Sequence, residues 1–161
     1  MGYIIQTDDP DILKRNLRAA SLVKETKLLN ITRLAKMLVD LYGLDKQFKR
    51  LKKREGQEVE LYLPALDGYI TLLLTSDKNK FDCRVEKAKN PVSTIEVKVK
   101  EKDILKVLSN IIRSKDNIFG LLKVAKLYLF RKVKIKGSMI AAILLVRSLM
   151  IGKDRVYKYK Y

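Results

Sequence analysis

The chain has 161 residues, of which 47% are hydrophobic, and this predicts one domain (1–161) with a sizeable core. It contains no histidine and a single cysteine, Cys83. These counts exclude Ser-His and Cys-His nucleophilic pairs, an intrachain disulfide, and a zinc site built from clustered Cys or His ligands. Because a Gly-rich phosphate loop is also missing, we expect a non-catalytic protein without metal or cofactor.

The formal net charge is +17, and the positive charge is concentrated in two regions. Residues 14–54 hold 13 Lys and Arg against three acidic residues, and residues 121–161 hold 11 against one. Residues 55–120 are balanced, with 11 of each sign. Two basic regions predict an anionic partner, either lipid headgroups or nucleic acid.

Targeting signals are not recognisable at either end of the sequence. The first residues, MGYIIQTDDPD, lack the basic and apolar regions of a secretory signal, and the last residues, YKYKY, match neither a prenylation box nor a peroxisomal address. We therefore expect a cytoplasmic protein that can associate peripherally with membranes.

The N-terminal third is predicted to be helical. A capping sequence with proline, TDDP, precedes residues 11–29, where apolar residues recur at helical intervals. Asn30 is expected to break or recap the helix, so residues 1–30 form a predicted N-terminal extension. A second apolar stripe, Ile31–Leu51, predicts an amphipathic helix that Gly43 weakens in its middle, so the helix can kink or break there.

The end of this second helix, KQFKRLKKREG, is dense in basic residues. Cations at a helix C-terminus complement the helix dipole and Gly56 suits the stop, so a solvated helix end accounts for the pattern. The alternative is a contact surface for an anionic partner, either the lipid headgroups of a membrane or nucleic acid. Its candidate residues are Lys46, Lys49, Arg50, Lys52, Lys53 and Arg54.

Three runs of alternating residues then predict an antiparallel meander. They cover residues 59–63, 69–75 and 81–85, with an Asp67-Gly68 turn between the first two. Cys83 is expected to be a small core residue. The paired carboxylates Glu58 and Glu60 are expected on an exposed strand face, and we do not assign them an acid/base role.

A fourth strand is predicted at residues 95–99, followed by apolar helices at 102–113 and 118–129. The stretch Lys132–Ile151 then combines a fifth strand with a Gly137 turn, a Ser138 cap and an apolar helix. The sequence therefore predicts an α+β fold, with a five-stranded mixed sheet and helices covering one face.

The last helix, residues 139–151, has three interpretations because its residues from Met139 to Val146 are all apolar. It can be a core helix, a membrane span or the wall of an apolar ligand cavity. At ~1.5 Å per residue it covers about 20 Å, which is too short for a ~30 Å hydrocarbon layer, and Arg147 interrupts it. Periodicity does not separate the other two interpretations.

Two segments resemble the sterol carrier protein type-2 domain family: TIEVKVKEKDILKVL at 94–108 and FRKVKIKGSMIAAILL at 130–145. In that family a strand leads into an acidic cap and an apolar helix, and a strand with a glycine turn leads into the last helix. The resemblance assigns residues 31–152 to a sterol-carrier-like domain and leaves 153–161 as a basic Tyr/Lys tail. Ser138 departs from the Asp or Asn usual after the motif glycine.

The resemblance implies a tunnel, enclosed by the apolar helices, for a fatty acyl, sterol or isoprenoid chain. Each residue predicted to line it fits ordinary core packing equally well. The predicted ligand-binding residues are Ile104, Leu108, Ile111, Phe119, Leu122, Met139, Ile143, Val146 and Met150.

The sequence thus favours a non-catalytic lipid-binding or lipid-transfer protein that docks on anionic membranes through its basic regions. The alternative is a basic nucleic-acid-binding protein, although no zinc finger, RNA-stacking motif or helix-turn-helix spacing is present. A third hypothesis is a scaffold that binds a partner helix in an apolar groove.

Overall fold

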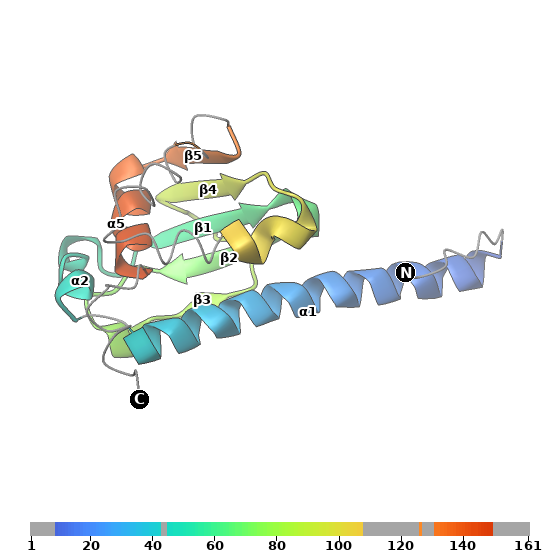
Figure 1. The fold of residues 1–161 in the computed structure, drawn as a ribbon, viewed down its shortest axis with the longest axis horizontal. Helices are drawn as coiled ribbons and strands as arrows, with labels where there is room; N and C mark the ends of the chain where they lie inside the picture. The colour runs from blue at the N-terminus through green and yellow to red at the C-terminus, as the bar shows by residue number, and fades with distance from the viewer. Residues whose placement is uncertain (1–8, 43–44, 108–125, 127–130, 150–161) are drawn as a thin grey trace.

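The computed structural model describes residues 9–42, 45–107, 126 and 131–149 (Figure 1). Five strands form one sheet in the order β3-β2-β1-β4-β5. Neighbouring strands are antiparallel except β1 and β4, which run parallel. The strands are β1 Glu58–Leu63, β2 Gly68–Leu73, β3 Cys83–Arg84, β4 Ser93–Val97 and β5 Val133–Gly137.

The helices pack on one face of this sheet. Those within the described residues are α1 Pro10–Tyr42, α2 Asp45–Lys49 and α5 Met139–Leu149, and short 3-10 turns lie beside the strands. Helix α1 contacts β2 and β3, and α5 contacts β4 and β5. Side chains from both layers, including Val59, Ile70 and Cys83 from the sheet and Ile31 and Leu145 from the helices, form one buried cluster. The structure confirms the predicted α+β fold with a five-stranded mixed sheet.

The predicted break at Asn30 is wrong, because α1 is one continuous helix of 33 residues. A single asparagine costs a helix only a few tenths of a kcal/mol, and the buried stripe on both sides of it outweighs that cost. This stripe includes Leu28, Ile31 and Val39, which are 5%, 8% and 2% exposed. Residues 9–27, in contrast, are all exposed and extend beyond the sheet (Figure 1).

The basic segment was predicted to end a helix that could kink or break at Gly43, and α1 does end at Tyr42, just before that glycine. The basic segment forms the short helix α2 and a 3-10 turn, Lys52–Arg54. Phe48 and Leu51 anchor the segment, being 0% and 1% exposed. Phe48 meets Phe81 edge to face, with ring centroids 6.1 Å apart.

Glu60 was predicted to lie on an exposed strand face, but it is 4% exposed. The chain that follows β3 covers this side of the sheet, where the Thr71 hydroxyl donates to the Glu86 carbonyl at 2.8 Å. The Glu60 carboxylate accepts from the Ala88 N–H at 3.0 Å and from the Thr94 hydroxyl at 3.4 Å. Alternation along one strand could not reveal this cover, because it comes from a distant loop.

The turn between β5 and α5 has the predicted chemistry. Gly137 has φ +85°, and the Ser138 hydroxyl oxygen accepts from the Ala141 N–H at 3.2 Å, which caps α5. The Ser138 N–H donates to the Val92 carbonyl at 2.9 Å. This turn therefore ties the last helix to the chain entering β4.

Gly137→Ala should destabilise the fold more than Gly56→Ala. Both glycines have positive φ, +85° and +79°, so alanine pays ~1–2 kcal/mol of backbone strain at either position. A Cβ at Gly137 would also lie 2.5 Å from the Val92 carbonyl oxygen, whereas a Cβ at Gly56 meets nothing within 4 Å. Urea denaturation measures both free energies of unfolding, and equal losses would contradict the close approach at Gly137.

Candidate functional site

An apolar groove opens between α1, the 3-10 turn Pro64–Leu66 and the segment that follows β4, which is yellow in Figure 1. Its volume is about 650 Å³. Five aliphatic side chains line it: Ile31, Leu34, Leu66, Ile104 and Leu105. Leu34 and Leu105 are 38% and 57% exposed, so the groove presents open hydrocarbon surface to a ligand.

The rim of the groove is charged. Lys27 of α1 forms an ion pair with Glu101 of the 3-10 turn Glu101–Asp103, which links the two walls. Lys100 and Lys102 also lie on the rim, and within the described part of the chain neither forms a salt bridge. An apolar floor with cations at its edge suits an amphipathic molecule whose polar end is acidic.

Of the predicted ligand-binding residues, the structure places Ile104 in this groove, 2% exposed. Met139 and Ile143 are 39% and 47% exposed and lie on the side of α5 away from the sheet, because Ala141, Ala142 and Leu145 take the inner side. Val146 is half-buried against the core. The other predicted residues lie outside the described residues: Leu108, Ile111, Phe119, Leu122 and Met150.

Sequence reasoning did not assign four of the five aliphatic residues that line the groove. Ile31 and Leu34 belong to the amphipathic stripe of α1, and this pattern does not distinguish a core position from a ligand contact. Leu105 is in a predicted apolar helix but is not on its expected ligand face. Leu66 follows a proline in a 3-10 turn, where no periodic signal exists.

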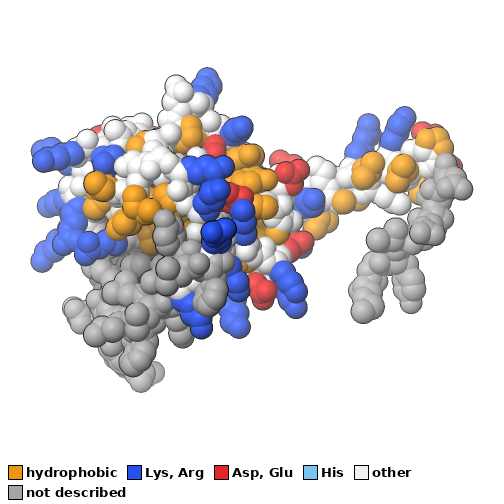
Figure 2. All heavy atoms as spheres, turned by 90° about the horizontal axis from the view of Figure 1, so that it is seen from above, with side chains coloured by type: hydrophobic (Ala, Val, Ile, Leu, Met, Phe, Trp, Pro, Cys, Tyr) orange, Lys and Arg blue, Asp and Glu red, His pale blue; other side chains and the backbone are white. Residues whose placement is uncertain are grey.

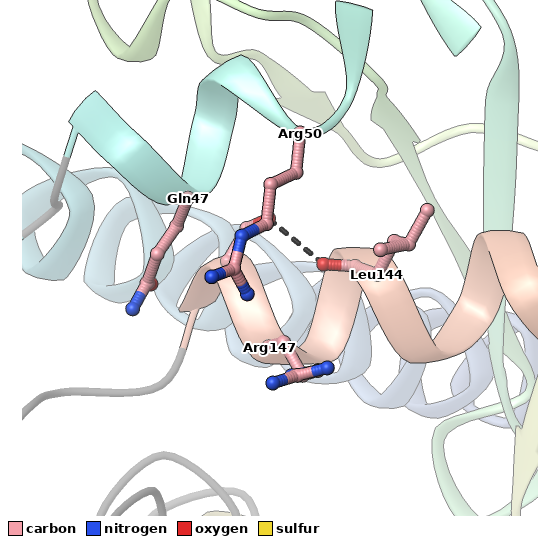
Figure 3. Close-up of a pocket in the computed structure, with 5 residues that line it drawn as sticks. Gln47, Arg50, Leu144 and Arg147 are labelled. Carbon is pink, nitrogen blue, oxygen red and sulfur yellow. Dashed lines mark hydrogen bonds between the residues drawn. The ribbon is translucent and has the colours of Figure 1, made fainter. Parts of the chain in front are cut away.

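A second, small cavity of about 30 Å³ lies between α2 and α5 (Figure 3). Arg50, which follows α2, and Arg147 of α5 both contribute side chains to its lining. The side-chain oxygen of Gln47 is buried there without a hydrogen-bond partner among the described residues. The Ser148 hydroxyl does not satisfy it, since it donates to the Leu144 carbonyl at 2.8 Å.

This cavity lies within a basic surface at the end of the molecule where α2 and α5 meet (Figure 2, left). This surface contains the six predicted membrane-contact residues. Five of them are exposed: Lys46, Lys49, Arg50, Lys52 and Lys53. The sixth, Arg54, is half-buried and donates to the Gln57 side chain at 3.2 Å. No carboxylate in the described ranges forms a salt bridge with any of them. Met139, Ile140 and Ile143 expose hydrocarbon on the neighbouring face of α5.

Cys83 lies in the core, as predicted, and is 3% exposed. Its thiol donates to the Thr32 carbonyl at 3.3 Å. Burial raises the pKa of the thiol to about 11, so it is protonated at neutral pH and poorly suited to act as a nucleophile. Within the described ranges no cluster of three acidic or Cys side chains could hold a metal ion, and no helix is long and apolar enough to cross a bilayer.

Comparison with solved structures identifies the fold. A structure described as a UbiJ-SCP2 ubiquinone synthesis protein matches with a TM-score of 0.55 and 15% identity over 79% of this chain and 96% of that chain. The sterol carrier protein domain 2 of Helicoverpa armigera matches at 0.46, with 16% identity over 76% of this chain and 85% of that one. No family model and no curated protein sequence matches.

The first of these matches, together with the strand order and helix placement, shows that the chain has a sterol-carrier-protein-type-2-like fold. A variant of the sec-alkyl sulfatase PisA1 also matches, at a TM-score of 0.42 and 12% identity, over 63% of this chain and 14% of that chain. The resemblance noted in the sequence is therefore confirmed at the level of the fold.

The burial of Cys83 predicts a loss of stability at alkaline pH. The pKa of the thiol is 9.0 in the unfolded reference and about 11 in the folded protein, so above pH 9 the unfolded chain releases a proton that the folded chain keeps. The free energy of unfolding should therefore fall between pH 9 and 11, and less steeply in Cys83→Ala. Urea denaturation at pH 8, 9 and 10 measures the difference, and parallel pH profiles for the two proteins would contradict it.

Proposed function

We propose that this protein is a non-catalytic lipid carrier that holds a fatty acyl, sterol or isoprenoid chain in the groove between α1 and the segment after β4. The observation that carries the proposal is the groove itself, with five aliphatic side chains on its walls and lysines on its rim. The fold supports the proposal because the structures it resembles include proteins described as sterol carrier and ubiquinone synthesis proteins.

The dimensions of the groove suit this ligand class. Its volume of about 650 Å³ lies within the usual ~300–1,000 Å³ range of small-molecule sites. Each buried methylene contributes about 0.8 kcal/mol, so a long chain gains on the order of 10 kcal/mol before ordering costs. Because one methylene changes this little, we expect selectivity for the head group rather than for chain length.

The lysines on the rim of the groove indicate which head group the bound lipid would have. Lys100 and Lys102 would attract a carboxylate or phosphate at the mouth of the groove, while Lys27 is already paired with Glu101. We therefore infer that a fatty acid binds more tightly than the fatty alcohol of the same length.

Membrane docking forms the second part of the proposal. Each Lys or Arg near an anionic bilayer contributes about 1 kcal/mol, so the basic surface on α2 and the turn after it would give reversible binding. The exposed apolar residues of α5, Ile140 and Ile143, would enter the interfacial region beside the cations.

Nucleic acid is the competing anionic partner, and a gel shift at physiological salt tests it. Saturable binding of DNA or RNA under those conditions, without lipid binding, would replace the carrier proposal. Lipid extracted from the purified protein and identified by mass spectrometry would support it.

Leu105→Gln and Leu34→Gln should each weaken binding of a fluorescent fatty acid. Losing one apolar wall residue removes about 1–2 kcal/mol from the binding free energy of the fatty acid, which is roughly a 5- to 30-fold rise in the dissociation constant. Leu29→Gln is the matched control, since Leu29 is 39% exposed on α1 but does not line the groove. Equal affinities in all three variants would place the ligand elsewhere.

The triple variant Lys46/Lys49/Lys53→Gln should bind anionic vesicles less tightly than the wild type. Removal of three cations is expected to weaken binding on the order of 100-fold. Lys132/Lys134/Lys136→Gln removes the same charge from the exposed residues beside and on β5 and serves as the control. Vesicle sedimentation measures both, and equal losses would show that net charge alone governs the interaction.

A further inference from the structure

Helix α1 consists of a packed part and a projecting part. Residues 9–27, which we call the arm, are exposed at every position, whereas Leu28, Ile31 and Val39 further along the helix are buried. The arm extends well away from the sheet (Figure 1) and is seen as a narrow extension in Figure 2. Its shape exposes both sides of the helix to a partner.

An apolar stripe continues from the packed part onto the arm. Leu13, Leu17 and Ala20 follow steps of four and three residues and lie on the same side of the helix as Leu28 and Ile31. Leu13 and Leu17 are 52% and 62% exposed. In the packed part of α1 this stripe lies against the sheet. In the arm, the same stripe has no packing partner among the described residues.

A second copy of the chain supplies a matching surface. Positions 13, 17, 20 and 24 have the heptad spacing by which two helices interlock. The arm carries five basic and three acidic side chains, so it is close to neutral in a chain of net charge +17. Contact through the arms thus brings two copies together at a part of the chain where their mutual repulsion is small.

Charge also selects the orientation of the two arms. Side-by-side parallel arms would place Lys24 against Lys24 and bring the two basic bodies together. Antiparallel arms separate the bodies and bring Asp9, the acidic residue on the stripe side of the arm, toward Lys24 of the second copy.

We propose that two copies of this protein associate through antiparallel pairing of their arms along the Leu13–Leu17–Ala20 stripe. The stripe runs into the groove, since Ile31 belongs to both. The tip of each arm would then lie beside the groove of the other copy. The pairing itself is independent of the proposed lipid-binding function.

Light scattering coupled to gel filtration, at about 1 to 200 μM protein, tests the pairing. The wild type should shift from monomer to dimer across this range, and Leu13→Glu/Leu17→Glu should stay monomeric. Leu22→Glu is the control, because Leu22 is 63% exposed but lies ~140° around the helix from Leu17. Circular dichroism checks that each variant is folded.

Two outcomes would overturn the proposal. A wild type that is monomeric throughout the range shows that the arms do not pair. A dimer that Leu22→Glu weakens as much as the stripe variant shows that the stripe is not the interface. If the stripe variant instead loses vesicle binding while the wild type remains monomeric, the arm is a membrane contact and the proposal fails.

Spin labels at Arg18→Cys and Asp11→Cys test the orientation, since both residues lie off the stripe and Cys83 is buried from the reagent. In an antiparallel pair the labels at position 18 lie at nearly the same level along the axis, and those at position 11 are about 20 Å further apart along the axis at ~1.5 Å per residue. Similar distances at both positions indicate a parallel pair and overturn the antiparallel arrangement.

Discussion

The packing of α1 against β2 and β3 is the constraint on which the rest of the structure depends. The end of the Leu28 side chain packs so closely on Gly68 of β2 that a Cβ at position 68 would overlap it. Lys36 of α1 pairs with Asp82 at 2.9 Å across the same contact. Because α1 continues without a break through this contact, one docking interaction fixes two features. It places Ile31 and Leu34 in the wall of the groove, and it directs the arm away from the body.

The groove and the basic surface lie at different ends of the sheet (Figure 1). The groove is lined by the segments that come directly after β1 and β4, whereas the basic surface lies around α2 and α5. In the proposed function the site that holds the chain and the site that meets the bilayer are therefore separate. Such an arrangement would leave the groove accessible from solution while the protein is docked, and loading would not require the docked state.

Individual residues show why some features were predictable from the sequence. Val59 alternates with its neighbours, and Gly137 with Ser138 has the residue types that a turn and a cap require, so the strand and the helix start were identified. Glu60 was misplaced because a distant loop covers it. The predicted break at Asn30 was wrong because the low helix propensity of asparagine costs only a few tenths of a kcal/mol. The packing of the helix on both sides of Asn30 contributes more than this cost.

The sequence by itself determined the α+β class, the five strands, the buried thiol and the basic character of residues 46–54, since these follow from local periodicity and composition. Only the tertiary structure decided which apolar residues stay open. Leu34 and Leu105 look like core residues in the sequence, yet both are exposed at the groove, whereas Ala141 and Leu145 take the inner side of α5. Hydrophobicity requires burial somewhere, but the elements that meet around each side chain determine whether protein or another molecule covers it.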